Sequence, residues 1–291
     1  IESLYYKDKN LYSLVIKTFL NELIFDFNSQ GFFEKNLIWI NSYQKEDLNY
    51  LNKFLLFYFD SNIELGDFTY FASKIANKLN LQTKNKISFD DFVNLNQILQ
   101  FTISLENKNK TTFFTNNSAF YEIQSLKNYF TYTNLTKCFI CVVKNPLDIF
   151  ADLSHFKNNL SKDDSINEII NSHRSFNSEL HNEVEIEQNK QSWNVNVNSW
   201  TNENVVNTFN GLIIKYDDLI SNGLDVFADV VAHLNQSGLN TKLDYGKIKD
   251  FVTENKSVYN QNYKGFEISN KIRKLLERDC ASMMKKYKFL S

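Results

Sequence analysis

Four short apolar runs, separated by longer segments with the apolar period of a helix, constrain the fold of this chain most. The runs are rich in β-branched and aromatic residues and comprise residues 36–41, 111–115, 137–144 and 212–216. The helical segments comprise residues 48–59, 68–79, 90–105, 148–156, 219–234 and 267–287. This alternation is typical of βαβ units and predicts an α/β protein with a central parallel sheet flanked by helices. Its neighbouring parallel strands are expected to carry Ile38, Phe113, Ile140 and Ile213.

The domain organisation follows from length and from the absence of linker-like sequence. The 291 residues are 43% hydrophobic, which is enough for one large core. No internal repeat or Pro/Gly-rich linker divides the chain, so we expect a single domain over residues 1–291. Residues 1–35 are predicted to form an N-terminal helical extension, in which residues 11–27 have one apolar face and pack rather than span a membrane. Residues 161–191 are polar and are predicted to form a partly helical surface excursion or lid.

Charge and cysteine usage restrict the partners and the compartment. A net charge of −2 argues against binding to nucleic acid or to an anionic membrane surface. Three cysteines and no recognisable signal segment lead us to expect the reducing cytoplasm. Cys138 and Cys141 lie three apart in an expected strand, so their side chains point to opposite faces and do not converge on a metal or a disulfide.

Several common classes of active site have no support. The four histidines show no ligand spacing, so we predict no metal site. The sequence contains no G-x-S-x-G elbow of a hydrolase and no G-x-x-x-x-G-K-[ST] loop of a P-loop kinase. Two lysines, Lys45 and Lys144, follow the first and third expected strands. Ligands of open α/β sheets bind at this edge, although solvated lysines are also common there.

The order of the strand-end segments resembles the sulfotransferase superfamily. Residues 37–51 resemble its first motif, S-Y-P-K-S-G-N-T-W-L, and residues 114–118 resemble K-T-H-N-A. Residues 142–148 resemble V-R-N-P-L-D, 192–200 resemble S-W-x-x-H-V-x-S-W, 215–219 resemble R-Y-E-D-L, and 284–290 resemble the closing M-x-x-F-G-Y-L. Each match is loose, but six in order from residue 36 onwards are specific. The resemblance is greatest to bacterial sulfotransferases that act on small molecules or lipids.

This resemblance implies a P-loop-type sulfotransferase fold and a ligand. The family transfers a sulfuryl group from 3′-phosphoadenylyl sulfate (PAPS) to a hydroxyl or amine, without a metal. At the matching positions, Lys45 corresponds to the contact with the 5′-phosphosulfate and Lys144 to the arginine on the 3′-phosphate. The remaining matches are Asn116 at the catalytic histidine, Asp152 at a phosphate-binding serine, and Tyr50 and Tyr216 beside the adenine. Both tyrosines are equally compatible with ordinary core packing.

The departures from the family pattern argue against ordinary catalysis. Glu46 and Asp47 replace the serine and glycine of the first motif, and Asp152 adds a third carboxylate against the nucleotide phosphates. At ~4 Å and an effective dielectric of about 20, each such like-charge pair costs about 4 kcal/mol. Asn116 cannot take a proton near neutral pH. Base-composition bias explains Lys for Arg or Asn for His, since the chain has only three arginines, but not Glu46 with Asp47.

The sequence therefore predicts a sulfotransferase-like protein whose activity is impaired or lost and which serves as a binding or regulatory module. The alternative is an active sulfotransferase with a rearranged site, in which Lys45 or Lys144 has an altered role. Whether the chain is an enzyme stays open at this point, as do its acceptor and its oligomeric state. Binding of PAPS or of the product adenosine 3′,5′-bisphosphate (PAP) is expected to be weak.

Overall fold

The computed structural model contains a central five-stranded parallel sheet, in the order β10-β7-β1-β4-β2. It describes residues 35–60, 63–68, 86–87, 89–108, 110–123, 128–157, 160–171, 174–176, 185–259 and 267–290. The strands are β1 (Leu37–Ser42), β2 (Ile63–Asp67), β4 (Thr111–Asn116), β7 (Thr136–Val143) and β10 (Gly211–Lys215). Four of them are the strands expected from the sequence, which confirms the predicted fold class.

The register of the sheet brings the predicted strand centres together. Ile38 of β1 lies beside Phe113 of β4, and Ile40 lies beside Ile140 of β7. Ile213 of β10 lies beside Cys141. The prediction of neighbouring parallel strands is thus confirmed. The sequence pattern missed β2, because Glu64, Gly66 and Asp67 interrupt its short apolar stretch.

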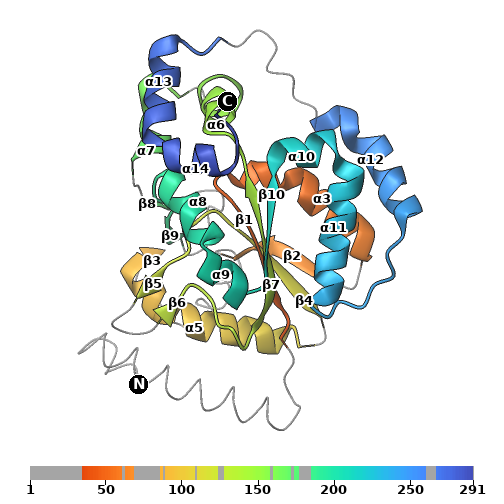
Figure 1. Cartoon of the computed structure of the whole chain (residues 1–291). Helices are drawn as coiled ribbons and strands as arrows, with labels where there is room; N and C mark the ends of the chain where they lie inside the picture. Colours follow the sequence, from red (N-terminus) through yellow and green to blue (C-terminus); the bar gives the residue numbers. More distant parts are fainter. Residues whose placement is uncertain are drawn as a thin grey trace, which may run out of the picture.

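Helices cover both faces of the sheet (Figure 1). One face packs against α3 (Asn49–Phe59), α11 (Gly223–Gln236) and α12 (Tyr245–Tyr259). The other packs against α5 (Phe89–Glu106), α6 (Pro146–Ala151), α7 (Lys162–Ile170), α8 (Trp193–Thr201), α13 (Asn270–Asp279) and α14 (Ala281–Lys286). Cys138 belongs to the first core and Cys141 to the second, which confirms that their thiols point to opposite faces.

Shorter elements join these layers. They are η1 (Lys45–Leu48), η3 (Asp152–Lys157), α9 (Glu203–Thr208) and α10 (Tyr216–Ser221). Small sheets are formed by β3 (Lys86–Ile87), β8 (Arg174–Phe176) and β9 (Glu185–Asn189), and by β5 (Glu122–Ile123) and β6 (Asn128–Tyr129). Within the described residues, no helix is both long and apolar enough to cross a membrane.

Three expected helices have different limits in the structure. The helix expected over 219–234 is two helices, α10 and α11, which meet at Asn222. The helix expected over 267–287 is likewise divided at Cys280, whose φ of −103° and ψ of 7° leave the helical region. The helix expected from residue 148 already begins at Pro146, because the Asn145 side chain caps it by accepting from Leu147 N–H.

The expected polar excursion over 161–191 differs from the structure in its first part. There α7 buries Ile166 and Ile169 in the core, with Ser161 as its N-cap. A lid role for this segment stays a prediction, and part of the segment lies outside the described residues. The N-terminal extension (apart from residue 35) and most of the helix expected over 68–79 also lie outside them.

Candidate functional site

The candidate site lies where β1, β4, β7 and β10 end at the same edge of the sheet. Lys45 begins η1 just after β1, and Lys144 follows β7 directly. In parallel sheets these ends are the usual location of ligands. The two lysines that the sequence singled out are therefore at the predicted edge. The charges around them decide what the edge can bind.

Lys144 is buried between two carboxylates. Its Nζ lies 2.9 Å from Oδ1 of Asp47 and 2.6 Å from Oδ2 of Asp152. The exposed fractions of the three residues are 3%, 2% and 0%. Asp47 belongs to η1 and Asp152 begins η3, so two short helical elements each place a carboxylate on one ammonium group. A buried charge is costly unless it is paired, and here Lys144 is paired twice.

This geometry changes the meaning of the two aspartates. The sequence suggested that Asp47 and Asp152 oppose the phosphates of a bound nucleotide. In the structure both carboxylates bind Lys144, which the sequence motifs match to the family arginine. Glu46, the third acidic residue of the set, is exposed, and neither ion pair to Lys144 involves it. The two carboxylates therefore neutralise the Lys144 ammonium group and do more than repel an approaching phosphate.

Lys45 is also paired within the chain. Its ammonium group forms an ion pair with Asp67 at the end of β2, and both side chains are about a fifth exposed, at 22% and 23%. The strand that carries Asp67 was not predicted, so sequence reasoning missed this partner. No local signal connects the two residues, because the strand order of the sheet brings them together.

Further acidic groups surround Lys144. Burial, and then the charge of Asp217, raises the pKa of Asp148 to about 6, although Lys144 acts in the opposite direction. The pKa of Asp217 is raised as well, chiefly by burial. The ring of Tyr216 lies 4.4 Å from Lys144 Nζ, a cation–π distance. Tyr216 thus contacts the cation of the site, while its adenine contact stays a prediction.

Asn116, which the sequence motifs match to the family histidine, has its side-chain amide hydrogen-bonded within the protein. It is the last residue of β4 and is 3% exposed. Its Nδ2 donates to Asn41 Oδ1 at 2.9 Å and to the Ser118 carbonyl at 3.0 Å. Its Oδ1 accepts from Ser118 N–H at 3.2 Å. The amide orients the turn that follows β4, and an amide has no basic nitrogen.

Tyr50 belongs to an aromatic cluster in the core. It is 2% exposed, its ring stacks on Phe251 with centroids 5.5 Å apart, and it meets Phe227 edge-on at 5.1 Å. These contacts are those of a packing residue. A role beside an adenine stays a prediction that this packing does not favour.

Comparison with known proteins places this geometry in context. No family model matches the chain, and no curated protein matches it. Among solved structures, the chain is similar to mouse sulfotransferase SULT7A1 complexed with PAP, with a TM-score of 0.51 and 13% sequence identity. The match covers 88% of this chain and 90% of that chain.

The chain has the sulfotransferase fold. The likeness covers most of both chains. The expectation of bacterial relatives and the roles of the individual site residues stay predictions from sequence. Within the described residues, no group of three or more His, Cys, Asp or Glu side chains could hold a metal ion.

One residue that the sequence motifs contained but did not single out supports the site of this sulfotransferase fold. Trp193, fully buried at the start of α8, donates from Nε1 to the Lys144 carbonyl at 3.2 Å. Ser192 caps the same helix, and the bond ties α8 to the end of β7. Trp193 therefore fixes the backbone from which the Lys144 side chain enters the cluster.

Proposed function

We propose that this chain is a sulfotransferase-fold protein in which the family's nucleotide-phosphate site is filled by the protein's own carboxylates. Sulfuryl transfer from PAPS is then impaired or lost, and the fold serves a binding or regulatory role. The observation that carries the proposal is the buried cluster in which Asp47 and Asp152 both bind Lys144. A small-molecule or lipid ligand and a cytoplasmic location stay predictions from sequence.

The charge balance of the cluster supports this proposal. A phosphate that approached Lys144 would have to displace Asp47 or Asp152 and would leave that carboxylate buried beside a second anion. Both steps are unfavourable in a site with little water, where like charges repel strongly. Asp148 adds further negative charge as the pH rises above its pKa of about 6. The site therefore disfavours a dianion most at neutral and higher pH.

The lack of a base at Asn116 supports the same proposal. The acceptor hydroxyl of a sulfotransferase must lose a proton to a positioned group. Asn116 offers none, and its amide hydrogen-bonds to Asn41 and Ser118. Catalysis by the family's arrangement therefore requires a residue from elsewhere in the site.

Asp148 favours a second candidate, an active sulfotransferase with a rearranged site. A carboxylate with a pKa of about 6 can accept a proton near neutral pH, and Asp148 lies in the first turn of α6 at the same sheet edge. In this alternative Asp148 would be the general base, and PAPS binding would have to open the pairs around Lys144.

Calorimetric titration with PAP separates the two candidates. For a filled site we expect a Kd no tighter than about 1 mM, which corresponds to about 4 kcal/mol. The matched positive control is the variant Glu46→Ser/Asp47→Gly/Asp152→Ser, which removes the competing carboxylates. Micromolar binding by the parent chain, with sulfuryl transfer that falls as the pH drops below 6, would establish the rearranged enzyme instead.

A further inference from the structure

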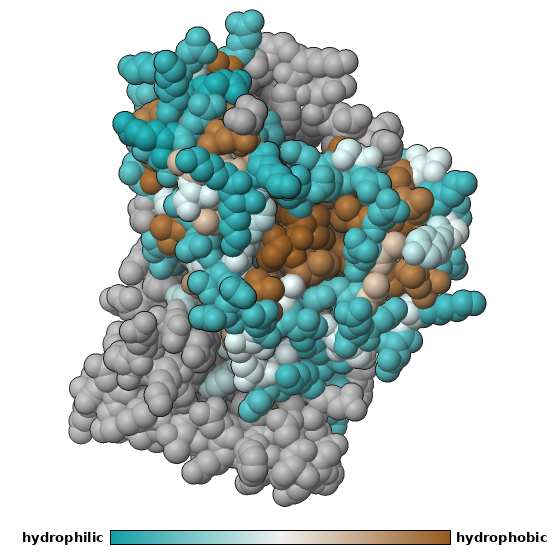
Figure 2. Space-filling model, in the orientation of Figure 1, coloured by the Kyte–Doolittle hydropathy of each residue, from teal (hydrophilic) through white to brown (hydrophobic). Residues whose placement is uncertain are grey.

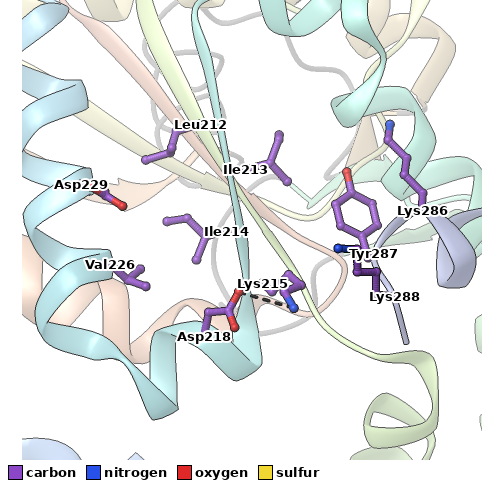
Figure 3. A pocket seen from close by; sticks show the side chains of 10 residues that line it. All are labelled: Leu212, Ile213, Ile214, Lys215, Asp218, Val226, Asp229, Lys286, Tyr287 and Lys288. Carbon is purple, nitrogen blue, oxygen red and sulfur yellow. Dashed lines mark ion pairs between the residues drawn. The ribbon is translucent and has the colours of Figure 1, made fainter. Parts of the chain in front are cut away.

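A groove follows the outer edge of the central sheet along β10. It has a volume of about 420 Å³, and its floor is β10, with Leu212, Ile213 and Ile214. Figure 2 shows an apolar area at the centre of this face, over β10 in the orientation of Figure 1. One wall comes from α10 and α11, and the other from the end of α14 and the two residues after it (Figure 3).

The backbone of β10 is available for another strand. β10 is the terminal strand of the five-stranded sheet and pairs with β7 on one side. Phe139 N–H donates to the Asn210 carbonyl, which fixes the phase of the ladder. Since alternate residues of a strand present their N–H and C=O groups to the same side, Gly211 and Ile213 point theirs away from β7. Within the described part of the chain, the N–H and C=O groups of these two residues have no backbone hydrogen-bond partner on that outer side.

The two faces of this edge differ in charge. Leu212 and Ile214 belong to the core on the α11 face, where Asp229 lines the groove. Asp218 also lines the groove and forms an ion pair with Lys215 at 3.5 Å. Ile213 belongs to the opposite face, where Lys286 and Lys288 line it. Figure 3 shows Asp229 on one side of β10 and the two lysines on the other. Apart from the Lys215–Asp218 pair, the α11 face therefore combines apolar floor residues with the acidic Asp229, and the opposite face combines them with the basic Lys286 and Lys288.

These features specify what kind of chain fits. An added strand projects its side chains alternately to the two faces of the sheet. Residues over α11 would meet Asp229, and those between them would meet Lys286 and Lys288. We propose that β10 is the docking edge for an extended peptide segment of another protein, with basic or apolar residues alternating with acidic or apolar ones. Main-chain bonds to Gly211 and Ile213 supply affinity, and the alternating charges supply specificity.

A second copy of this chain is a poorer occupant of the same edge. Two β10 strands that pair antiparallel about a two-fold axis keep like faces on the same side of the joined sheet. Lys286 and Lys288 of one copy would then approach those of the other, and Asp229 would approach Asp229. Like-charge contacts of this kind disfavour self-pairing. The binding role that we propose for the fold would thus have an extended peptide as its partner. This docking edge does not depend on whether PAP binds.

The test uses the full chain and a random decapeptide display library. Peptides are selected on the parent protein after counter-selection on Ile213→Pro, which removes an outward N–H without removing a bond to β7. We expect enriched sequences with lysine or arginine at alternate positions and glutamate or aspartate between them. The best peptide should bind Ile213→Pro about tenfold more weakly in fluorescence anisotropy. Hydrogen exchange at the Gly211 and Ile213 amides should slow when it binds.

Charge reversal keeps the test decisive if Ile213→Pro folds poorly. In Asp229→Lys/Lys288→Glu the selected peptide should lose affinity, and its counterpart with lysines and glutamates exchanged should gain it. The matched control, Asp250→Lys/Lys274→Glu, changes exposed residues of α12 and α13 and should bind like the parent. The proposal fails if no peptide is enriched, if charge reversal leaves peptide preference unchanged, or if the chain forms a dimer that Ile213→Pro abolishes.

Discussion

Nζ of Lys144 lies 2.6 Å from Oδ2 of Asp152, a residue eight positions later in the chain, and both side chains are almost fully buried. Because Asp47 also binds this ammonium group at 2.9 Å, the cation is already surrounded by anionic oxygen. Two carboxylates thus pair with the lysine that the sequence motifs match to the phosphate-binding arginine of the sulfotransferase family, and we propose that they take the place of a phosphate there. The first two predictions follow from this replacement.

Removing one carboxylate should destabilise the fold, and an added anion that binds at Lys144 should recover part of the lost stability. We expect Asp152→Ser to lower the free energy of unfolding by about 3 kcal/mol, because a buried ion pair loses one partner. Inorganic phosphate should restore part of this loss by binding at Lys144, whereas sodium chloride at equal ionic strength should not. Urea unfolding in each salt measures both effects. Asp163→Ser, at an exposed position in the first turn of α7, is the control and should be unaffected by phosphate.

Opening the whole site should restore nucleotide affinity before turnover. The variant Glu46→Ser/Asp47→Gly/Asp152→Ser removes three anions, and we expect it to bind PAP at least ~100-fold more tightly, a gain of about 2.7 kcal/mol. Calorimetry measures the gain. Adding Lys144→Met to this variant should abolish it, since the freed ammonium group is its source. Equal affinities of parent and variant would mean that the loop has been rebuilt for a different ligand.

The opened variant should still transfer no sulfuryl group, because Asn116 supplies no base. Adding Asn116→His should produce slow turnover, since a positioned base typically contributes about 10²–10⁴-fold. A coupled assay for PAP release from PAPS measures the rate. Turnover by the opened variant without the added histidine would point to Asp148 as the base.

The raised pKa of Asp148 should make stability fall with increasing pH. Burial raises this pKa from 3.8 to about 6, so the folded state binds a proton more tightly than the unfolded state does. Stability is therefore greatest below the unfolded pKa and is lost as the pH rises through the folded pKa. We expect Asp148→Asn to raise the free energy of unfolding by about 1–2 kcal/mol at pH 8 and much less near pH 4.

Urea unfolding across that pH range measures the effect of Asp148→Asn. Its control is Asp163→Asn, which changes an exposed carboxylate in the first turn of another helix, α7. A gain in the free energy of unfolding that is equal at both ends of the pH range would show that folding does not raise the pKa of Asp148.

The first residue of β10 should tolerate no side chain. A Cβ atom at Gly211 would lie 2.2–2.9 Å from ring atoms of Phe139, which is buried in the core. We expect Gly211→Ala to cost about 1–3 kcal/mol in thermal or urea unfolding, because the packed ring must move. Gly223→Ala is the matched control, since its Cβ would make only ordinary contacts at the start of α11. That change should be neutral or stabilising.

Local sequence determined most of the fold. The strands that carry Ile38, Phe113, Ile140 and Ile213 were predicted because burial on both faces of a parallel sheet requires continuous apolar runs. The opposite faces of Cys138 and Cys141 followed from strand geometry alone. The pattern failed at β2, which is too short and polar. It also failed at Cys280, where the backbone leaves the helical conformation and divides an amphipathic stretch into two helices.

The site itself was decided by tertiary structure. The sequence identified Lys45, Lys144, Asp47 and Asp152 as important and predicted that the two aspartates oppose a nucleotide phosphate, but it did not predict that both pair with Lys144. Lys144 and Asp47 are 97 residues apart, and Lys45 meets Asp67 only because β2 joins the sheet beside β4. Strand order sets which loops meet, and the cost of burying a lone charge then forces the groups that meet to pair. Local sequence shows neither effect, so only the folded chain shows that Lys144 already pairs with Asp47 and Asp152.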